Sequence, residues 1–143
     1  MQLNMITSEI KLIGTVMKSI NIDNSIVDVQ PNAQKSFGFN INEPTFEECN
    51  DRMIAELLID FAVEIEQKEN EKCRIEFTVG GAFASENHID KTQFEKLVMI
   101  NGAAAIMGIA RGKIEAVSAN IFNCGKVSIP FVNIVDYYKS LKQ

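Results

Sequence analysis

Apolar side chains recur at every second residue in two neighbouring stretches of the chain, residues 54–66 and residues 71–80. They are Leu57, Ile59, Phe61, Val63 and Ile65 in the first stretch, and Cys73, Ile75, Phe77 and Val79 in the second. A period of two is typical of a strand that packs on a core with one face and meets water with the other. Because a short polar turn joins the two stretches, they are predicted to form an antiparallel hairpin.

A long first strand is predicted over residues 9–23. Its apolar residues Ile10, Leu12, Val16, Ile20 and Ile22 share one parity. Gly14 indicates a bulge or a bend within this strand.

A short second strand is predicted over residues 36–42, through Phe37, Phe39 and Ile41. Pro44 is expected to end it. Residues 45–52 are polar and are interpreted as a crossover loop that leads to the hairpin.

A helix is predicted over residues 91–101 and a second one over residues 103–120. Asp90 stands in the position of an N-cap, with Gln93 three residues later as in a capping box. The pair Asn101 and Gly102 is expected to kink or break the helical stretch.

The second of these helices is rich in small residues. They are Ala103, Ala104, Ala105, Gly108, Ala110 and Gly112. A glycine inside a helix costs about 1 kcal/mol relative to alanine, so these residues are predicted to allow close helix packing. Packing within one subunit and packing between subunits both satisfy this prediction.

The last helix is predicted over residues 133–142, with Asn133 as its N-cap and Asp136 in its first turn. Four strands followed by helices predict an α+β fold, in which the C-terminal helices pack on one face of a four-stranded antiparallel sheet. The 143 residues are expected to form one domain over residues 1–143.

Composition and charge narrow the classes of function. The formal net charge is −5 and Lys and Arg form no cluster, so nucleic acid is not an expected partner. The longest apolar window, residues 100–110, is shorter than the about 20 residues that cross a bilayer, so no membrane insertion is expected. The N-terminus has no signal-peptide pattern, and the three widely spaced cysteines are expected to be reduced thiols of a cytoplasmic protein.

No residue pattern predicts an enzyme, a metal site or a cofactor. The single histidine, His88, lies in a polar loop, where exposure to solvent is the expected state. Gly80 and Gly81 lack the neighbours of a phosphate-binding loop and are interpreted as a turn. The acidic residues on the outer face of the predicted hairpin are expected either to be solvated or to dock a basic partner.

Three motifs follow one another along the chain in a distinctive order. Two long strands meet at a polar turn and end in a Gly-Gly dipeptide within residues 56–81. A helix then carries Ile106, Ala110 and Arg111 as an aliphatic residue, a small residue and Ala-Arg. Finally an extended segment with Pro130, Val132 and Asn133 opens the last helix, which contains two tyrosines. This order resembles the protein-export chaperone SecB family over residues 9–141.

The resemblance implies a SecB-like homotetramer, built as a dimer of dimers, with long apolar grooves that bind unfolded polypeptides or preproteins. It also implies a role in protein transport, with delivery to the translocase ATPase SecA through an acidic patch on the sheet. Asp23 and Glu76 retain the acids of that patch. Ser19 lacks the acid at its position, and Arg74 places a cation where an apolar residue is usual.

The sequence departs from the family pattern at two further places. Met107, Gly108 and Ile109 replace the usual aromatic-proline pair before Ala-Arg. The connection between the first two strands is several residues shorter and has no tryptophan, although the family places there an aromatic residue that lines the client groove. The groove is therefore expected to be narrower or specialised for one client.

The leading hypothesis is an ATP-independent holdase that is not an enzyme. Its client-binding residues are predicted to be Phe37, Phe39, Phe46 and Met53, and its partner-docking acidic face is predicted to comprise Asp23, Asp60, Glu64 and Glu76. One alternative is a dedicated SecB-like chaperone of a single partner such as an antitoxin. An alternative of another class is a small hot-dog-like enzyme, such as a thioesterase, or a ligand-binding domain.

Overall fold

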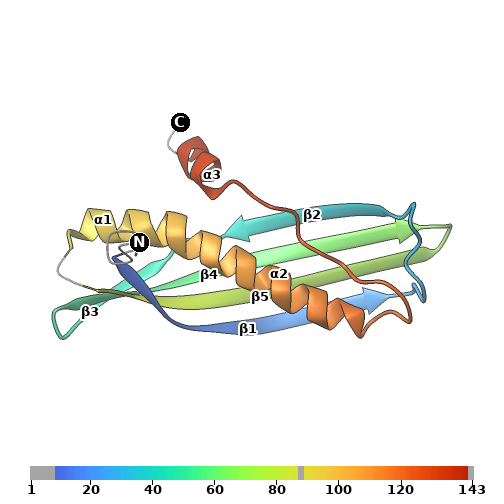
Figure 1. Ribbon diagram of the computed structural model, residues 1–143, viewed down its shortest axis with the longest axis horizontal. Helices are drawn as coiled ribbons and strands as arrows, with labels where there is room; N and C mark the ends of the chain where they lie inside the picture. Colours follow the sequence, from blue (N-terminus) through green and yellow to red (C-terminus); the bar gives the residue numbers. More distant parts are fainter. Residues whose placement is uncertain (1–8, 87–88, 142–143) are drawn as a thin grey trace, which may run out of the picture.

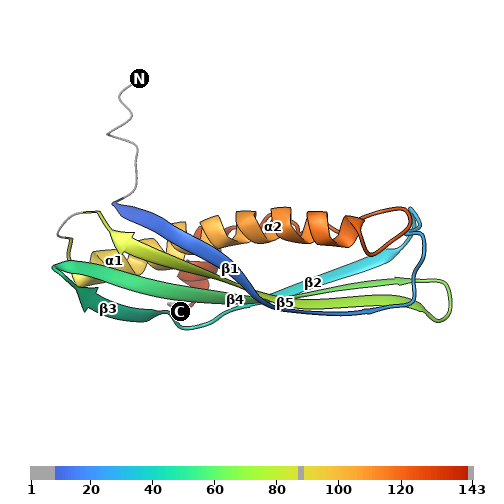
Figure 2. The ribbon, with the colours of Figure 1, turned by 90° about the horizontal axis from the view of Figure 1, so that it is seen from below.

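The computed structural model describes residues 9–86 and 89–141 of the chain, so His88 lies outside the described residues. The protein consists of two layers, a long twisted antiparallel sheet and a helical layer on one of its faces (Figures 1 and 2). The predicted α+β class, with the helices on one face of the sheet, is confirmed.

Five strands form the sheet. They are β1 (Ile10–Asn24), β2 (Gln34–Ile41), β3 (Thr45–Cys49), β4 (Arg52–Gln67) and β5 (Glu71–Ser85). Their order is β1-β5-β4-β2, and β3 pairs with the part of β4 that β2 leaves free. The predicted hairpin is the central pair of β4 and β5, and both strands are longer than expected. Gly80 and Gly81 therefore lie inside β5 and not in a turn.

The interpretation of residues 45–52 as a loop is wrong, because Thr45–Cys49 form the fifth strand, β3. Asn50 and Asp51 form the two-residue turn between β3 and β4. Their φ angles of 52° and 65° lie in the left-handed region that such a hairpin turn requires. Asn and Asp tolerate this region better than other residues with a side chain. Because β3 lies at the edge of the sheet and carries mostly polar residues, its sequence lacks the apolar alternation that would predict a strand.

The apolar residues of strand β1 do not all lie on one face of the sheet. A bulge between Leu12 and Gly14 confirms the predicted irregularity, and a second one lies between Met17 and Ser19. Residues that face each other in an antiparallel pair share one face of the sheet. Ile20, opposite Phe77, consequently lies on the helix side, whereas Val16, opposite Gly80, lies on the outer side.

Of the predicted kink or break at Asn101 and Gly102, a break is wrong, because one continuous helix runs diagonally across the sheet (Figure 1), and the pair lies in an irregular turn of it. Helix α1 (Lys91–Leu97) continues through the π-helical turn η2 (Val98–Gly102) into α2 (Ala103–Ala119). At Gly102 a Cβ atom would lie 3.1 Å from the ring of Phe83, so the missing side chain lets the helix pack closely on that ring. Asp90 precedes the helix as predicted, but its side chain makes no capping hydrogen bond.

The joined helix Lys91–Ala119 has 29 residues and a mean hydropathy of 1.3 in its most apolar window. By length and composition it could cross a membrane, since residues 100–110, the longest apolar window of the sequence, cover only part of the joined helix. A core helix that covers a sheet has the same properties, and Phe94, Val98 and Ile106 of this helix are fully buried in the hydrophobic core. These properties alone are therefore weak evidence of a membrane span.

The small residues of α2 divide between two faces of the helix. Ala103 and Ala110 are buried in the core. Ala104, Gly108 and Gly112 are exposed, and no atom lies within 4 Å of a Cβ atom built at either glycine. Close packing within this chain therefore does not explain Gly108 and Gly112.

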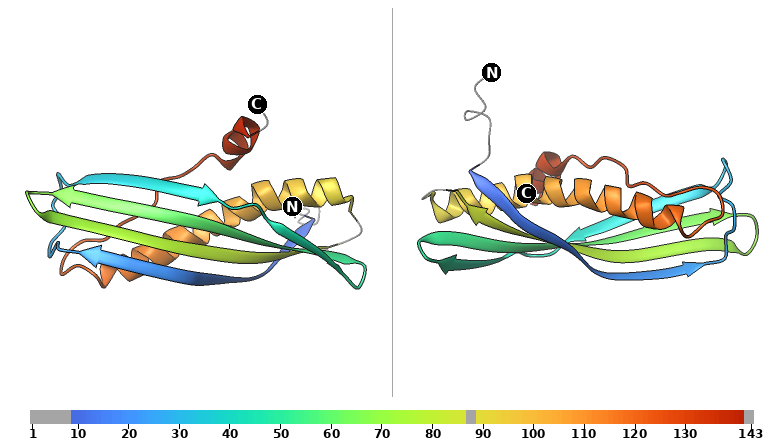
Figure 3. Two further views of the ribbon diagram at one scale, coloured as in Figure 1. Left: turned by 180° about the vertical axis from the view of Figure 1, so that it is seen from behind. Right: turned by 60° about the horizontal axis from the view of Figure 1, so that its bottom comes forward.

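Helix α3 (Ile134–Ser140) projects beside β2 at the edge of the sheet (Figure 3). The predicted cap is confirmed, because the Asn133 side chain accepts a hydrogen bond of 3.0 Å from the backbone N–H of Asp136. Ile134 is buried, and the ring centroids of Tyr137 and Phe39 lie 5.4 Å apart. These contacts join the end of the chain to the β2 edge.

Candidate functional site

An extended segment, residues 127–131, runs back along α2 and is here called the strap. Val127 and Ile129 are buried, while Ser128, Pro130 and Phe131 are exposed. This alternation and the fixed φ angle of Pro130 keep the strap extended. The strap passes from the end of α2 towards α3, on the side of α2 that carries β2 (Figure 1).

Three polar side chains on one side of α2 hold the strap. Val127 donates its N–H to Ser118 Oγ at 2.8 Å, and Ser128 Oγ donates to Glu115 Oε1 at 2.6 Å. Arg111 donates from Nε to the carbonyl of Ile129 at 2.8 Å and from an Nη atom to the carbonyl of Pro130 at 3.2 Å. Arg111, Glu115 and Ser118 are spaced by four and three positions and so line one face of the helix. They therefore contact the strap at successive points along its length.

The loop before the strap is attached to the connection between β1 and β2. Asn123 Nδ2 donates to Asp28 Oδ1 at 2.9 Å, and the N–H of Val29 donates to the carbonyl of Cys124 at 2.9 Å. Gly125 has a φ angle of 110°, and a Cβ atom there would lie 2.8 Å from Val29. Both the beginning of the strap and its course along α2 are thus defined by specific contacts.

A groove of about 570 Å³ lies between the strap, α2 and the β2 edge. Its lining residues are Lys35, Ser36, Phe37, Val63, Arg111, Glu115, Val127, Ser128, Ile129, Pro130 and Phe131. The Phe131 side chain is 90% exposed, and the Arg111 guanidinium lies 4.3 Å from its ring centroid. Within the described residues, β2 pairs with no strand other than β4, so its second edge is open beside the groove.

Replacing Ser118 with alanine is expected to lower the free energy of unfolding by about 1–3 kcal/mol, because the buried N–H of Val127 loses its acceptor. Ser140→Ala is the matched control, since that hydroxyl lies on an exposed turn, and a change within about 0.5 kcal/mol is expected. Urea unfolding of the parent and both variants at one protein concentration measures the difference. Equal stability of the two variants would contradict the role given to Ser118.

The structure brings together only some of the predicted client-binding residues. Phe37 lines the groove and stacks on Phe39, with ring centroids 5.8 Å apart. Phe46 lies instead against Phe94 of α1, at 5.9 Å, and Met53 is half-buried beside Ser85. Phe46 and Met53 lie away from Phe37 because the chain is interrupted between β2 and β3, and β3 therefore pairs with the other part of β4.

The sequence prediction missed the strap side of the groove. Arg111 was noticed only as part of a family motif, and Phe131 and Ile129 were not identified as lining residues. The available signal was Phe131 itself, a large apolar residue directly after Pro130. Alternation within a five-residue segment is too short to separate a strap from a buried loop.

The predicted docking residues Asp23, Asp60, Glu64 and Glu76 all lie on the outer face of the sheet, opposite the helices. Arg74 lies among them, directly opposite Asp23 on one side and Glu64 on the other. Its guanidinium pairs with Glu64 and donates to Glu76 Oε1 at 2.5 Å. Two of the four acids, Glu64 and Glu76, therefore share one cation within the same face, which offsets one of their two negative charges.

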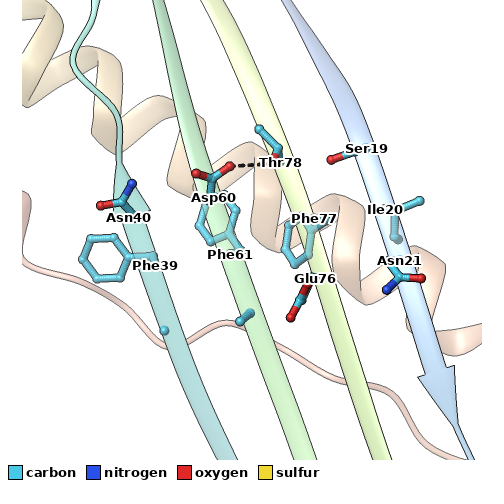
Figure 4. Close-up of a pocket in the computed structure, with 12 residues that line it drawn as sticks. Ser19, Ile20, Asn21, Phe39, Asn40, Asp60, Phe61, Glu76, Phe77 and Thr78 are labelled. Carbon is cyan, nitrogen blue, oxygen red and sulfur yellow. Dashed lines mark hydrogen bonds between the residues drawn. The ribbon is translucent and has the colours of Figure 1, made fainter.

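Asp60 borders a shallow hollow of about 410 Å³ on this outer face (Figure 4). The hollow exists because Gly38 and Ala62 leave space between longer side chains. Thr78 Oγ1 donates to Asp60 Oδ1 at 2.6 Å and Asn42 Nδ2 donates to Oδ2 at 3.0 Å. These hydrogen bonds, that of Thr78 first, lower the pKa of Asp60 because they favour the charged carboxylate.

Residues 9–86 and 89–141 contain no group of three His, Cys, Asp or Glu side chains that could hold a metal ion. Cys73 is buried, and this burial raises the pKa of its thiol, while Cys49 and Cys124 are exposed free thiols. The apolar groove is therefore the candidate site, and the outer acidic face is a second surface.

No protein-family model and no curated protein sequence matches this chain. A solved structure that does match is a SecB-like chaperone of Mycobacterium tuberculosis in complex with a ChAD peptide from the HigA1 antitoxin. The TM-score is 0.59, the sequence identity is 7%, and the match covers 87% of this chain and 91% of that chain. The order of elements, the antiparallel sheet and the covering helix agree with this likeness. The chain therefore has a SecB-like fold.

Proposed function

We propose that the protein is an ATP-independent chaperone that holds extended, unfolded polypeptide in the groove between β2 and the strap. The observation that carries the proposal is this groove, with its apolar lining and its open strand edge, on a SecB-like fold. Burial of apolar client side chains contributes about 25 cal/mol per Å² before ordering costs are subtracted. Such contacts need no nucleotide and little sequence specificity.

The open edge of β2 gives the client backbone a place to bind. An extended chain can add to an exposed strand edge through main-chain hydrogen bonds, while its side chains enter neighbouring pockets. Phe37 and Phe131 stand on opposite sides of the groove, one on the strand and one on the strap. A client side chain between them would be covered from both sides.

A dedicated partner, such as an antitoxin, is the second candidate for the client. The structural relative was solved with an antitoxin peptide. Delivery to SecA through the acidic face is the other proposal, and Arg74 argues against it because the guanidinium binds Glu76. Co-purification with one small partner supports the dedicated chaperone, whereas stoichiometric binding of SecA supports a role in protein transport.

We propose that the assembly is a homotetramer, a dimer of dimers. The edge strand β1 exposes Leu12, Ile13, Val16, Ile20 and Ile22. The outward face of α2 carries exposed Ala104, Gly108 and Gly112, which allow close approach of a second helix. These two surfaces provide two different contacts between copies, as a dimer of dimers requires.

Aggregation suppression in the absence of ATP tests the function. A chemically unfolded test protein is diluted into buffer with an excess of the chaperone, and light scattering is followed with an equal mass of albumin as the control. Suppressed scattering and a complex of defined mass in light-scattering chromatography are expected. Unchanged scattering for several unfolded test proteins would refute the general holdase, and a partner bound at one-to-one stoichiometry would then identify a dedicated chaperone.

We further propose that the protein works in the cytoplasm and has no catalytic activity. The described residues offer no metal-binding group, and the groove holds one carboxylate, Glu115, which accepts a hydrogen bond from Ser128. A hot-dog-like thioesterase is the alternative that a screen with acyl thioesters tests. Turnover that disappears in the Glu115→Gln variant would favour the enzyme.

A further inference from the structure

Lys35 faces the groove and not the acidic outer surface of the sheet. It lies directly opposite Ile65 in the β2–β4 pair, and Ile65 is buried on the helix side. Lys35 therefore shares a face with Phe37, while Ser36 between them shares a face with Glu64. A cation thus occupies an inward position at the end of an otherwise apolar row.

Arg111 is the second cation of the groove. Its guanidinium uses one N–H for Ile129 and one for Pro130, and both acceptors are neutral carbonyls. An arginine has five N–H donors, so donors are left for a ligand. Among the described residues, no carboxylate lies within ion-pair distance of Arg111 or of Lys35.

The groove therefore differs in charge from the rest of the protein. The chain has a formal net charge of −5, yet the groove contains two cations and one carboxylate, Glu115. That carboxylate accepts a hydrogen bond from the hydroxyl of Ser128 and does not pair with either cation. An unpaired cation beside apolar side chains attracts a carboxylate more strongly than the same cation in bulk water.

We propose that the groove prefers extended client segments in which an Asp or Glu lies next to a large apolar side chain. The apolar side chain would enter between Phe37 and Phe131, and the carboxylate would meet Lys35 and the free donors of Arg111. This preference rests on the proposed chaperone function and names the chemistry of its client. It predicts selection for acidic-apolar segments by a protein that is itself acidic.

An inward-pointing lysine also protects an edge strand from pairing with another copy. The variant Lys35→Glu separates the two roles, because a charged side chain remains on the edge while its sign is reversed. Within the described residues Lys35 makes no ion pair or side-chain hydrogen bond, so the variant is expected to fold. Lys11→Glu is the matched control, since it changes the net charge equally on β1, at the opposite edge of the sheet.

Fluorescence anisotropy with three labelled peptides tests the preference. The peptides share one extended apolar sequence with a central phenylalanine and differ only in two flanking residues, which are Glu, Gln or Lys. At low ionic strength the Glu peptide is expected to bind about fivefold more tightly than the Lys peptide, the upper range for an exposed ion pair. High salt is expected to reduce this ratio.

The variants give the decisive comparison. Lys35→Glu is expected to abolish or reverse the ratio, whereas Lys11→Glu is expected to keep the ratio and to leave the affinity of the Gln peptide within about twofold. Equal binding of all three peptides to the parent protein, or an unchanged ratio in Lys35→Glu, would overturn the charge preference and leave the chaperone function intact. Failure of every peptide to bind would refute the groove as the client site, and the charge preference with it.

Discussion

Replacing Phe131 with serine is expected to weaken the binding of unfolded client about tenfold or more. The ring is 90% exposed in the free protein, and full burial of such a side chain contributes about 1.5–3 kcal/mol to a complex. The free energy of unfolding should change by about 1 kcal/mol at most, because the variant loses only the exposed contact with Arg111. Anisotropy with a labelled apolar peptide measures the affinity.

Val27→Ser is the matched control for this experiment. Its side chain is 66% exposed and lies outside the groove lining. If exposed apolar residues bind the client nonspecifically wherever they lie on the surface, both variants will lose similar affinity for the client. A loss confined to Phe131→Ser assigns client binding to the groove, and an unchanged affinity in that variant contradicts the proposed site.

The largest loss of stability is expected from Ile106→Ala, at about 2–5 kcal/mol. Ile106 is fully buried where α2 crosses β5, and a Cβ atom at Gly81 would lie 3.0 Å from its Cδ1. Gly81→Ala is therefore expected to cost about 1–3 kcal/mol through overpacking. In the double variant the new methyl group enters the space left by Ile106, so the two losses should not add.

Urea unfolding of the four proteins at one concentration yields the coupling free energy, and about 0.5–3 kcal/mol is expected for residues in contact. Gly38→Ala is the control for a strand glycine, because no atom lies within 4 Å of a Cβ atom at that position. That control should be neutral or slightly stabilising. Strict additivity of Ile106→Ala and Gly81→Ala would show that α2 does not cross the sheet at Gly81.

The central hairpin could be predicted because its local pattern matches its tertiary environment. In β4, and in β5 as far as Val79, every second side chain enters one core, so the burial in the structure repeats the period of the sequence. The Asn133 cap was predictable for a similar reason, since it depends on residues three positions apart. Features of this kind are encoded within a few consecutive residues.

Other elements could not be predicted from local pattern. The second bulge of β1 shifts the parity of Val16 relative to Ile20, and a bulge without glycine leaves no signal in apolar spacing. The Asn101–Gly102 pair looked like a break, but Gly102 meets the ring of Phe83 across the layers. Its role depends on a residue that is distant in the sequence.

The residues of the candidate site likewise divide into those that local pattern predicts and those that it does not. Phe37 was predictable because it is an inward aromatic residue on an expected strand. Phe46 and Met53 lie away from Phe37, since β3 pairs with the other part of β4, and their role in client binding stays a prediction. The acidic residues share one face of the sheet, but only the tertiary structure shows that Arg74 forms ion pairs with two of them, Glu64 and Glu76.

The sequence by itself determined the α+β class, because alternating strands and capped helices are set by neighbouring residues. The tertiary structure alone decided the groove, which combines residues 35–37, Val63, residues 111–115 and residues 127–131 from four separate segments. Their meeting depends on the hydrogen bonds from the N–H of Val127 to Ser118 and from Arg111 to the carbonyl of Ile129, and no local pattern encodes these contacts. The charge of the groove, opposite in sign to that of the whole chain, likewise arises only when Lys35 and Arg111 line the same space.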